Sequence, residues 1–136
     1  MSVNSIILPD ILRQQIIEYA MTDPGHEVCG LLSACGQIFV RFYPVENIAE
    51  NRTCEFLMDP RQQISVIKDI RENSETMAAI FHSHPTSPAE PSTRDLALAY
   101  YPEMVYLILS LQGEQPELRA HYFDGKQFQE VEIKKD

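Results

Sequence analysis

Several kinds of segment are missing from this chain of 136 residues, and each absence removes a class of protein. No apolar run approaches the roughly 20 residues that a membrane-crossing helix requires. The amino-terminal sequence MSVNSIILPD lacks the basic start and the long apolar stretch of a signal peptide. The formal net charge is -9, and no run of lysine or arginine offers a surface to a phosphate backbone. We therefore expect a cytoplasmic protein that binds neither membrane nor nucleic acid.

Cysteine is also scarce. Cys29, Cys35 and Cys54 are an odd number without paired spacing, which argues against a disulfide framework. A chain of this length buries a hydrophobic core without such cross-links. We expect free thiols, with Cys29 and Cys54 as small buried residues. No internal repeat and no linker divides the chain, so a single domain over residues 1–136 is expected.

The hydrophobic patterns predict an α/β fold. Apolar side chains recur at helical spacing in residues 11–21 and 61–73, and a short helix is expected to start at Ser92. Strands are predicted where short apolar runs lie between turn residues, over residues 28–34, 37–45, 56–60, 77–84, 104–111, 117–123 and 127–133. The expected architecture is a single mixed sheet of about six strands with two main helices and one short helix.

The segment IFHSHPTSPAEPSTRDL carries most of the residues with catalytic chemistry. His82 and His84 alternate at a strand end, so the two-residue period of a strand points both imidazoles to the same face. Asp95 lies in the first turn of the next predicted helix, and the proline-rich loop before it can fold it back toward the strand end. Two histidines and a carboxylate suit a catalytic zinc ion, because the fourth tetrahedral position stays open for water.

A hydrolytic zinc site also uses a carboxylate that takes a proton from water and passes it to the leaving amine. Glu27 follows the Pro24-Gly25 turn at the entrance of a predicted strand and is one candidate. The residue pattern alone does not single it out among the 20 acidic residues of the chain.

Together these residues resemble the signature of the JAMM (MPN-plus) metalloproteases. That signature is an upstream Glu, then His, a small hydroxyl residue, His, Pro, a gap, Ser, two residues and Asp. It is complete here as Glu27, His82-Ser83-His84-Pro85, Ser92 and Asp95. The stretch EVCGLL resembles the first strand of the family, and FLMDP resembles the segment that leads its second helix. The resemblance covers nearly the whole chain and is to small standalone prokaryotic members.

The resemblance implies the cytidine-deaminase-like MPN/JAB fold and hydrolysis of a peptide or isopeptide bond. The implied substrate is the carboxyl-terminal tail of a ubiquitin-like or sulfur-carrier protein. By resemblance, His82, His84 and Asp95 bind one zinc ion, Glu27 is the general acid/base, and Ser92 steadies the oxyanion of the tetrahedral intermediate. The irregular stretch at residues 46–55 is short, whereas eukaryotic members carry long insertions that grip ubiquitin. A small or extended peptide partner is therefore expected.

Alternatives stay open at this point. The pattern from Ser92 to Asp95 is also that of a helix N-cap with a carboxylate in the first turn, so Ser92 can serve the helix instead of catalysis. The competing function is a noncatalytic scaffold domain of the same fold, although such relatives usually lack the ligands. His26 is expected at the surface, and His121 is expected in packing or at the surface. Ser83 is expected to face the side of its strand opposite to the two histidines.

Overall fold

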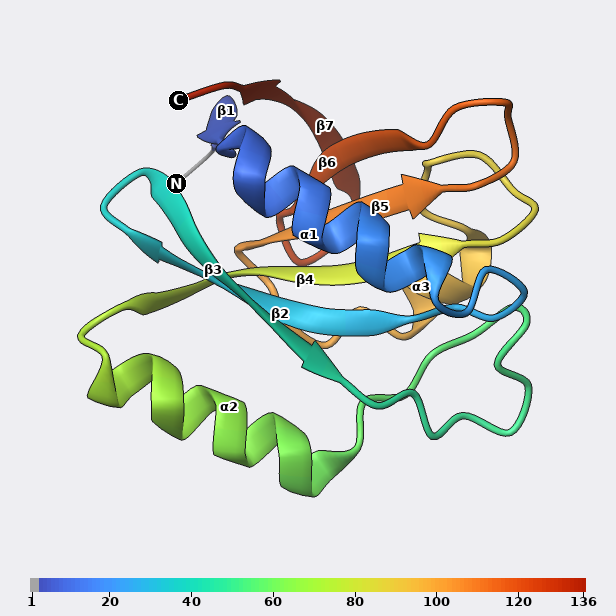
Figure 1. Ribbon diagram of the computed structural model, residues 1–136, viewed down its shortest axis with the longest axis horizontal. Helices are drawn as coiled ribbons and strands as arrows, with labels where there is room; N and C mark the ends of the chain where they lie inside the picture. Colours follow the sequence, from blue (N-terminus) through green and yellow to red (C-terminus); the bar gives the residue numbers. More distant parts are fainter. Residues whose placement is uncertain (1–2) are drawn as a thin grey trace.

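Seven strands form one mixed β-sheet in the computed structural model, which describes residues 3–136 (Figure 1). The strands are β1 Ser5–Ile7, β2 Cys29–Cys35, β3 Ile38–Val45, β4 Thr76–His84, β5 Met104–Ser110, β6 Glu117–Phe123 and β7 Phe128–Lys134. The helices are α1 Asp10–Met21, α2 Pro60–Glu72 and α3 Thr93–Ala97. Within the described range, none of these helices has the length and apolar character needed to cross a bilayer.

The strands follow the order β1-β3-β2-β4-β5-β6-β7 across the sheet. β1 pairs in parallel with both β3 and β7, so the sheet closes into a barrel. β4 lies between β2, to which it is antiparallel, and β5, to which it is parallel. A parallel pair needs a crossover connection, and residues 85–103, which include α3, provide it. β4 is therefore a central strand whose carboxyl end opens onto this crossover.

The two long helices and six of the seven strands lie within one residue of their predicted bounds, and α3 begins one residue after its predicted start at Ser92. The first difference is β1, which has three residues and whose parallel pairing with β7 leaves no local pattern in the sequence. The second is the strand predicted at residues 56–60, which is wrong. Met58 forms only an isolated bridge with Asn47, because the neighbouring Leu57 amide donates to the Asn47 side chain at 3.0 Å and α2 begins at Pro60.

Two hydrophobic cores occupy the opposite faces of the sheet. Leu12 and Ile16 of α1 pack in the same core as Phe81 of β4. Ile67 of α2 packs in a second core that includes Ile80 of β4. Since neighbouring residues of a strand point to opposite faces, α1 and α2 cover opposite sides of β4 (Figure 1). The even-numbered residues at the end of β4 therefore face the α2 side.

Candidate metal centre

The carboxyl end of β4 brings His82 and His84 together. Their Nε2 atoms lie 3.0 Å apart, and the side chains are 0% and 2% exposed. The intervening Ser83 points to the opposite face, where its Oγ accepts the Val28 amide hydrogen at 2.9 Å. The period-two geometry predicted for this strand end is confirmed.

The start of α3 brings a carboxylate to the same place. Asp95 Oδ2 lies 3.2 Å from His82 Nε2 and 3.1 Å from His84 Nε2. The orientation of Asp95 follows from a capping box: Ser92 Oγ accepts the Asp95 amide hydrogen at 3.0 Å, and Asp95 Oδ2 accepts the Ser92 amide hydrogen at 2.9 Å. Asp95 therefore belongs both to the helix cap and to the cluster of donor atoms. Ser92 is the N-cap residue of α3, which was one of the two roles that the sequence allowed for it.

The three donor atoms fit one small tetrahedral cation. His82, His84 and Asp95 form a group that could hold a metal ion, and their donor atoms are 3.0, 3.1 and 3.2 Å apart. Ligands about 2.0 to 2.1 Å from a tetrahedral zinc ion are separated by about 3.3 Å. His84 Nδ1 donates to the Pro88 carbonyl oxygen at 2.7 Å. Because a carbonyl oxygen only accepts, Nδ1 carries a proton, and Nε2 is the ring nitrogen that would present its lone pair to a cation.

The protonation states of two members of the cluster, His82 and Asp95, also suit metal binding. Burial lowers the pKa of His82, which favours the neutral imidazole. Burial alone would raise the pKa of Asp95, but the hydrogen bonds from His82 and His84 hold it well below its usual value. Burial lowers the pKa of His84, but the contact with Asp95 raises it overall, so a bound cation would have to displace a proton from His84 Nε2. A neutral imidazole and an ionised carboxylate are the forms that ligate a metal.

Glu27 lies two residues before β2, and its backbone N–H and carbonyl groups are both hydrogen-bonded. Its amide donates to the Arg52 carbonyl oxygen at 2.6 Å, and its own carbonyl accepts from Asn47 Nδ2 at 2.8 Å. The residue is 5% exposed, and its Oε1 atom has no hydrogen-bond partner. Burial raises the pKa of Glu27 to about 8, against the opposing effect of His84. A buried carboxyl oxygen without a partner is costly, and it marks a group placed for a ligand or a reacting water.

Comparison with known proteins adds to this geometry. The family model for prokaryotic homologs of the JAB domain matches residues 9–123. The chain belongs to this family. The JAB-domain chain is 32% identical over 126 residues to a desampylase of Haloferax volcanii, which covers 91% of this chain and 88% of the relative. It is also 32% identical over 108 residues to a probable TtuB-protein conjugate cleaving protease of Thermus thermophilus. This alignment covers 79% of this chain and 72% of the relative.

A solved structure also resembles the whole JAB-domain chain. A protein of Desulfitobacterium hafniense superposes with a TM-score of 0.87 at 34% identity, over 96% of this chain and 92% of that one. The resemblance noted in the sequence, in both family and fold, is thereby confirmed.

Two hollows border the candidate site of this JAB-domain protein. The larger, of about 720 Å³, has His82 and Asp95 in its wall together with apolar and aromatic side chains such as Phe56 and Tyr101. The smaller, of about 410 Å³, has Glu27 in its wall among mostly polar residues. Arg94, in the wall of the larger hollow, donates to Glu55 at 2.6 Å. The donor cluster and Glu27 therefore each border a hollow.

Asn47 is a site residue that the sequence did not indicate. Its Nδ2 donates to the Glu27 and Glu55 carbonyl oxygens at 2.8 and 3.0 Å, and its Oδ1 accepts the Ala49 and Leu57 amide hydrogens, each at 3.0 Å. Asn47 thus ties the irregular loop before α2 to the backbone of Glu27. A single asparagine in a polar stretch carries no spacing signal, so only the fold reveals this role.

The two remaining histidines lie outside the donor cluster. The imidazole of His26 is 37% exposed and pairs with Asp23 at 2.9 Å, which agrees with the surface position expected for it. His121 in β6 is 4% exposed and donates from Nε2 to the Ala89 carbonyl oxygen at 2.8 Å. His121 is therefore a buried packing residue with one specific hydrogen bond.

Proposed function

We propose that this JAB-domain protein is a zinc-dependent hydrolase that cleaves peptide or isopeptide bonds at the carboxyl-terminal tail of ubiquitin-like or sulfur-carrier proteins. The observation that carries the proposal is the convergence of three donor atoms beside a buried carboxyl group with a free oxygen. The relatives named desampylase and TtuB-protein conjugate cleaving protease support this class of substrate.

His82, His84 and Asp95 are assigned as the zinc ligands. When bound there, zinc would act as a Lewis acid toward the scissile carbonyl and would lower the pKa of the attacking water toward about 7. The chain fixes each ligand by a separate contact: the Pro88 carbonyl orients the ring of His84, and the capping box orients Asp95. His82 is held by stacking on Phe56, with ring centroids 4.5 Å apart.

Glu27 is assigned as the general acid/base. Its carboxylate removes one proton from the attacking water and then delivers that proton to the nitrogen of the leaving amine as the carbon–nitrogen bond breaks. A pKa near neutrality serves both steps, and burial already raises the pKa of Glu27 to about 8. The cation that the cluster is suited to hold would lower this pKa again, because a nearby positive charge favours the ionised carboxylate.

Ser92 is assigned to the oxyanion of the tetrahedral intermediate. Its Oγ accepts the Asp95 amide hydrogen, which leaves the hydroxyl proton of Ser92 available to donate. The capping role and the catalytic role are therefore compatible. A donor of this kind contributes about 3 kcal/mol to transition-state stabilisation.

The hollow beside His82 and Asp95 is assigned to the substrate tail, since its apolar wall fits the side chains of an extended peptide. We also propose that residues 1–136 act as one domain, because β1 near one end of the chain pairs with β7 near the other. A cytoplasmic location is supported by the free, exposed thiols of Cys35 and Cys54. A noncatalytic scaffold, the alternative function, would not need a donor cluster beside a buried carboxyl group.

The test uses conjugates made with the ubiquitin-like proteins encoded in the same genome, linked either to a lysine side chain or to a peptide amino terminus. Mass spectrometry of the products should show the whole ubiquitin-like protein, with its tail intact and ending in a free carboxylate. A chelator should stop the reaction, and added zinc should restore it. Absence of cleavage of both linkages, or cleavage that a chelator leaves unchanged, would contradict the proposal.

A further inference from the structure

The loop between the second histidine and α3 is held by its backbone. The side chains of Thr86, Ser87 and Pro88 are exposed, yet three consecutive carbonyl groups accept hydrogen bonds from buried side chains of the sheet. These bonds run from Ser110 Oγ to the Ser87 oxygen (2.6 Å), from His84 Nδ1 to the Pro88 oxygen (2.7 Å) and from His121 Nε2 to the Ala89 oxygen (2.8 Å). The three donors lie on β5, β4 and β6, which are neighbours in the sheet.

We propose that Ser110 and His121 are positioning residues for the metal centre. They anchor the carbonyl groups on either side of Pro88 and so hold the Pro88 carbonyl where it orients the ring of His84. This inference rests on the proposed zinc site and extends it to two residues that contact neither the metal nor the substrate.

The first argument concerns the freedom of the Pro88 carbonyl. The proline ring fixes one backbone dihedral of Pro88, and the anchored carbonyls of Ser87 and Ala89 restrict the peptide groups around it. The orientation of the Pro88 carbonyl is therefore restricted, and its oxygen accepts the hydrogen bond from His84 Nδ1. Hydrogen bonds of this kind set both the tautomer and the ring orientation of a metal-binding histidine.

The second argument concerns burial. Ser110 and His121 are 3% and 4% exposed, so neither can exchange its loop partner for bulk water. Displacement of the loop would leave both donors buried and unpaired, which is unfavourable. Ala89 is 0% exposed and fixes the same part of the loop by packing. The buried side chains of Ser110 and His121 thus fix the path of the loop that connects His84 to α3.

The test compares Ser110→Ala and His121→Phe with a matched control, Ser33→Ala. Ser33 is also a buried strand serine, and it donates a hydrogen bond to Glu75 at 2.7 Å, away from the loop. Zinc affinity is measured by competition with a chromophoric chelator, the geometry of the site by the visible spectrum of cobalt-substituted protein, and stability by thermal unfolding of the metal-free protein.

Ser110→Ala and His121→Phe should each weaken zinc binding about 10-fold and change the cobalt spectrum. Ser33→Ala should lower stability and leave zinc affinity and the spectrum at the values of the parent. His121→Gln retains an N–H donor of similar reach and should recover most of the affinity. If His121→Phe does not fold, Ser110→Ala and His121→Gln decide the question.

Parent-like zinc affinity and cobalt spectrum in Ser110→Ala and His121→Phe would overturn the inference. So would an equal loss of affinity in Ser33→Ala, because the effect would then be one of general stability. A parent protein that binds no zinc would overturn the proposed function as well, whereas zinc binding by the parent with unaffected variants would overturn only this inference.

Discussion

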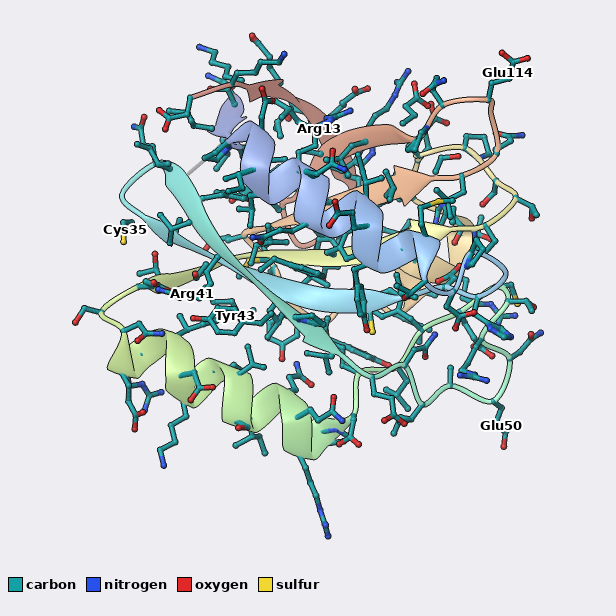
Figure 2. The ribbon with its side chains drawn as sticks, viewed as in Figure 1. Arg13, Cys35, Arg41, Tyr43, Glu50 and Glu114 are labelled. Atoms are coloured by element: carbon teal, nitrogen blue, oxygen red, sulfur yellow. The ribbon has the colours of Figure 1, made fainter. Side chains whose placement is uncertain are left out.

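Two clusters of polar side chains lie at opposite ends of β4, and they differ in whether their buried polar atoms have hydrogen-bond partners. At the amino end, the Glu75 carboxylate accepts hydrogen bonds from Ser33 at 2.7 Å, from Tyr43 at 3.1 Å and from Arg41 at 3.1 Å, and Figure 2 shows the last two on β3 near α2. At the carboxyl end, Glu27 Oε1 has no hydrogen-bond partner, and neither has His82 Nδ1, the ring nitrogen of His82 that is not part of the donor cluster.

The difference separates structural from functional polar groups. The Glu75 carboxylate is satisfied by the chain itself, and the Ser33 hydrogen bond, with further help from Arg41, lowers its pKa. The cluster at the other end has donor atoms that converge on one point and a carboxyl group whose pKa burial raises. A complete cluster stabilises the fold, whereas an incomplete cluster is arranged for a ligand. Substitutions at the two ends should therefore affect different quantities.

The largest effect is expected from Glu27→Gln. Loss of the general acid/base should lower kcat/KM about 1,000-fold. Zinc content and the melting temperature should not fall, because glutamine has the same shape and removes a buried ionisable group. Steady-state hydrolysis, metal analysis and thermal unfolding check the three quantities. A Glu27→Gln variant as active as the parent would refute the assignment.

Ser92→Ala is next in size. Loss of an oxyanion donor should lower kcat about 100-fold, while loss of the N-cap should cost about 1 kcal/mol of stability. Ser92→Thr keeps the hydroxyl group and should retain most of both quantities. Kinetics and urea unfolding of the two variants separate the roles. If the loss of kcat, expressed as a free energy, is no larger than the loss in free energy of unfolding, Ser92 acts as a helix cap alone.

Glu75→Ala should show the opposite pattern. Removal of the carboxylate leaves Ser33 without its acceptor and should lower the free energy of unfolding by about 2 kcal/mol. Zinc affinity and kcat/KM of the folded fraction should stay at the values of the parent. Urea unfolding and chelator competition check both. A large loss of zinc affinity would break the distinction between the two ends of β4.

The same carboxylate predicts a pH dependence of stability. The folded pKa of Glu75 lies below its usual value, so the unfolded chain takes up a proton first as the pH falls. The stabilisation from Glu75 is present above its unfolded pKa of about 4.3 and is lost as the pH drops through the folded pKa. Unfolding of Glu75→Gln across this range should show a smaller acid dependence than the parent, and an unchanged dependence would exclude Glu75 as its source.

The smallest effect concerns the thiols. Cys29 is buried next to the metal end of β4, and burial raises its pKa to about 12. Cys35 and Cys54 are exposed, and Figure 2 shows Cys35 at the turn between β2 and β3. A thiol reagent should modify both exposed cysteines in the native protein and Cys29 only after denaturation. Rapid native labelling of Cys29 would show that this end of the sheet opens to solvent.

Local patterns account for much of the fold and for the arrangement of the candidate site. The alternation of His82 and His84 and the capping pattern from Ser92 to Asp95 are short-range features, and the structure forms both. Cys54 was predicted to be buried, which is wrong, because it lies in an exposed turn of the loop before α2.

Contacts between distant segments account for what the sequence did not reveal. β1 depends on pairing with β7 at the other end of the chain. Asn47 and His121 act through backbone atoms 20 and 32 positions away. Such bonds join a side chain to a carbonyl group, so they leave no residue pattern at the partner position. A sequence pattern therefore identifies candidate ligands more readily than the residues that hold them in place.

The central claim is that the carboxyl end of β4 is a zinc site. Native mass spectrometry of the parent and of Asp95→Ala, each purified without chelator and supplied with zinc, tests it directly. The account predicts one zinc ion per parent chain and none retained by the variant, since Asp95 lies within 3.2 Å of both histidine nitrogens. A parent chain without zinc, or equal zinc retention by Asp95→Ala, would contradict it.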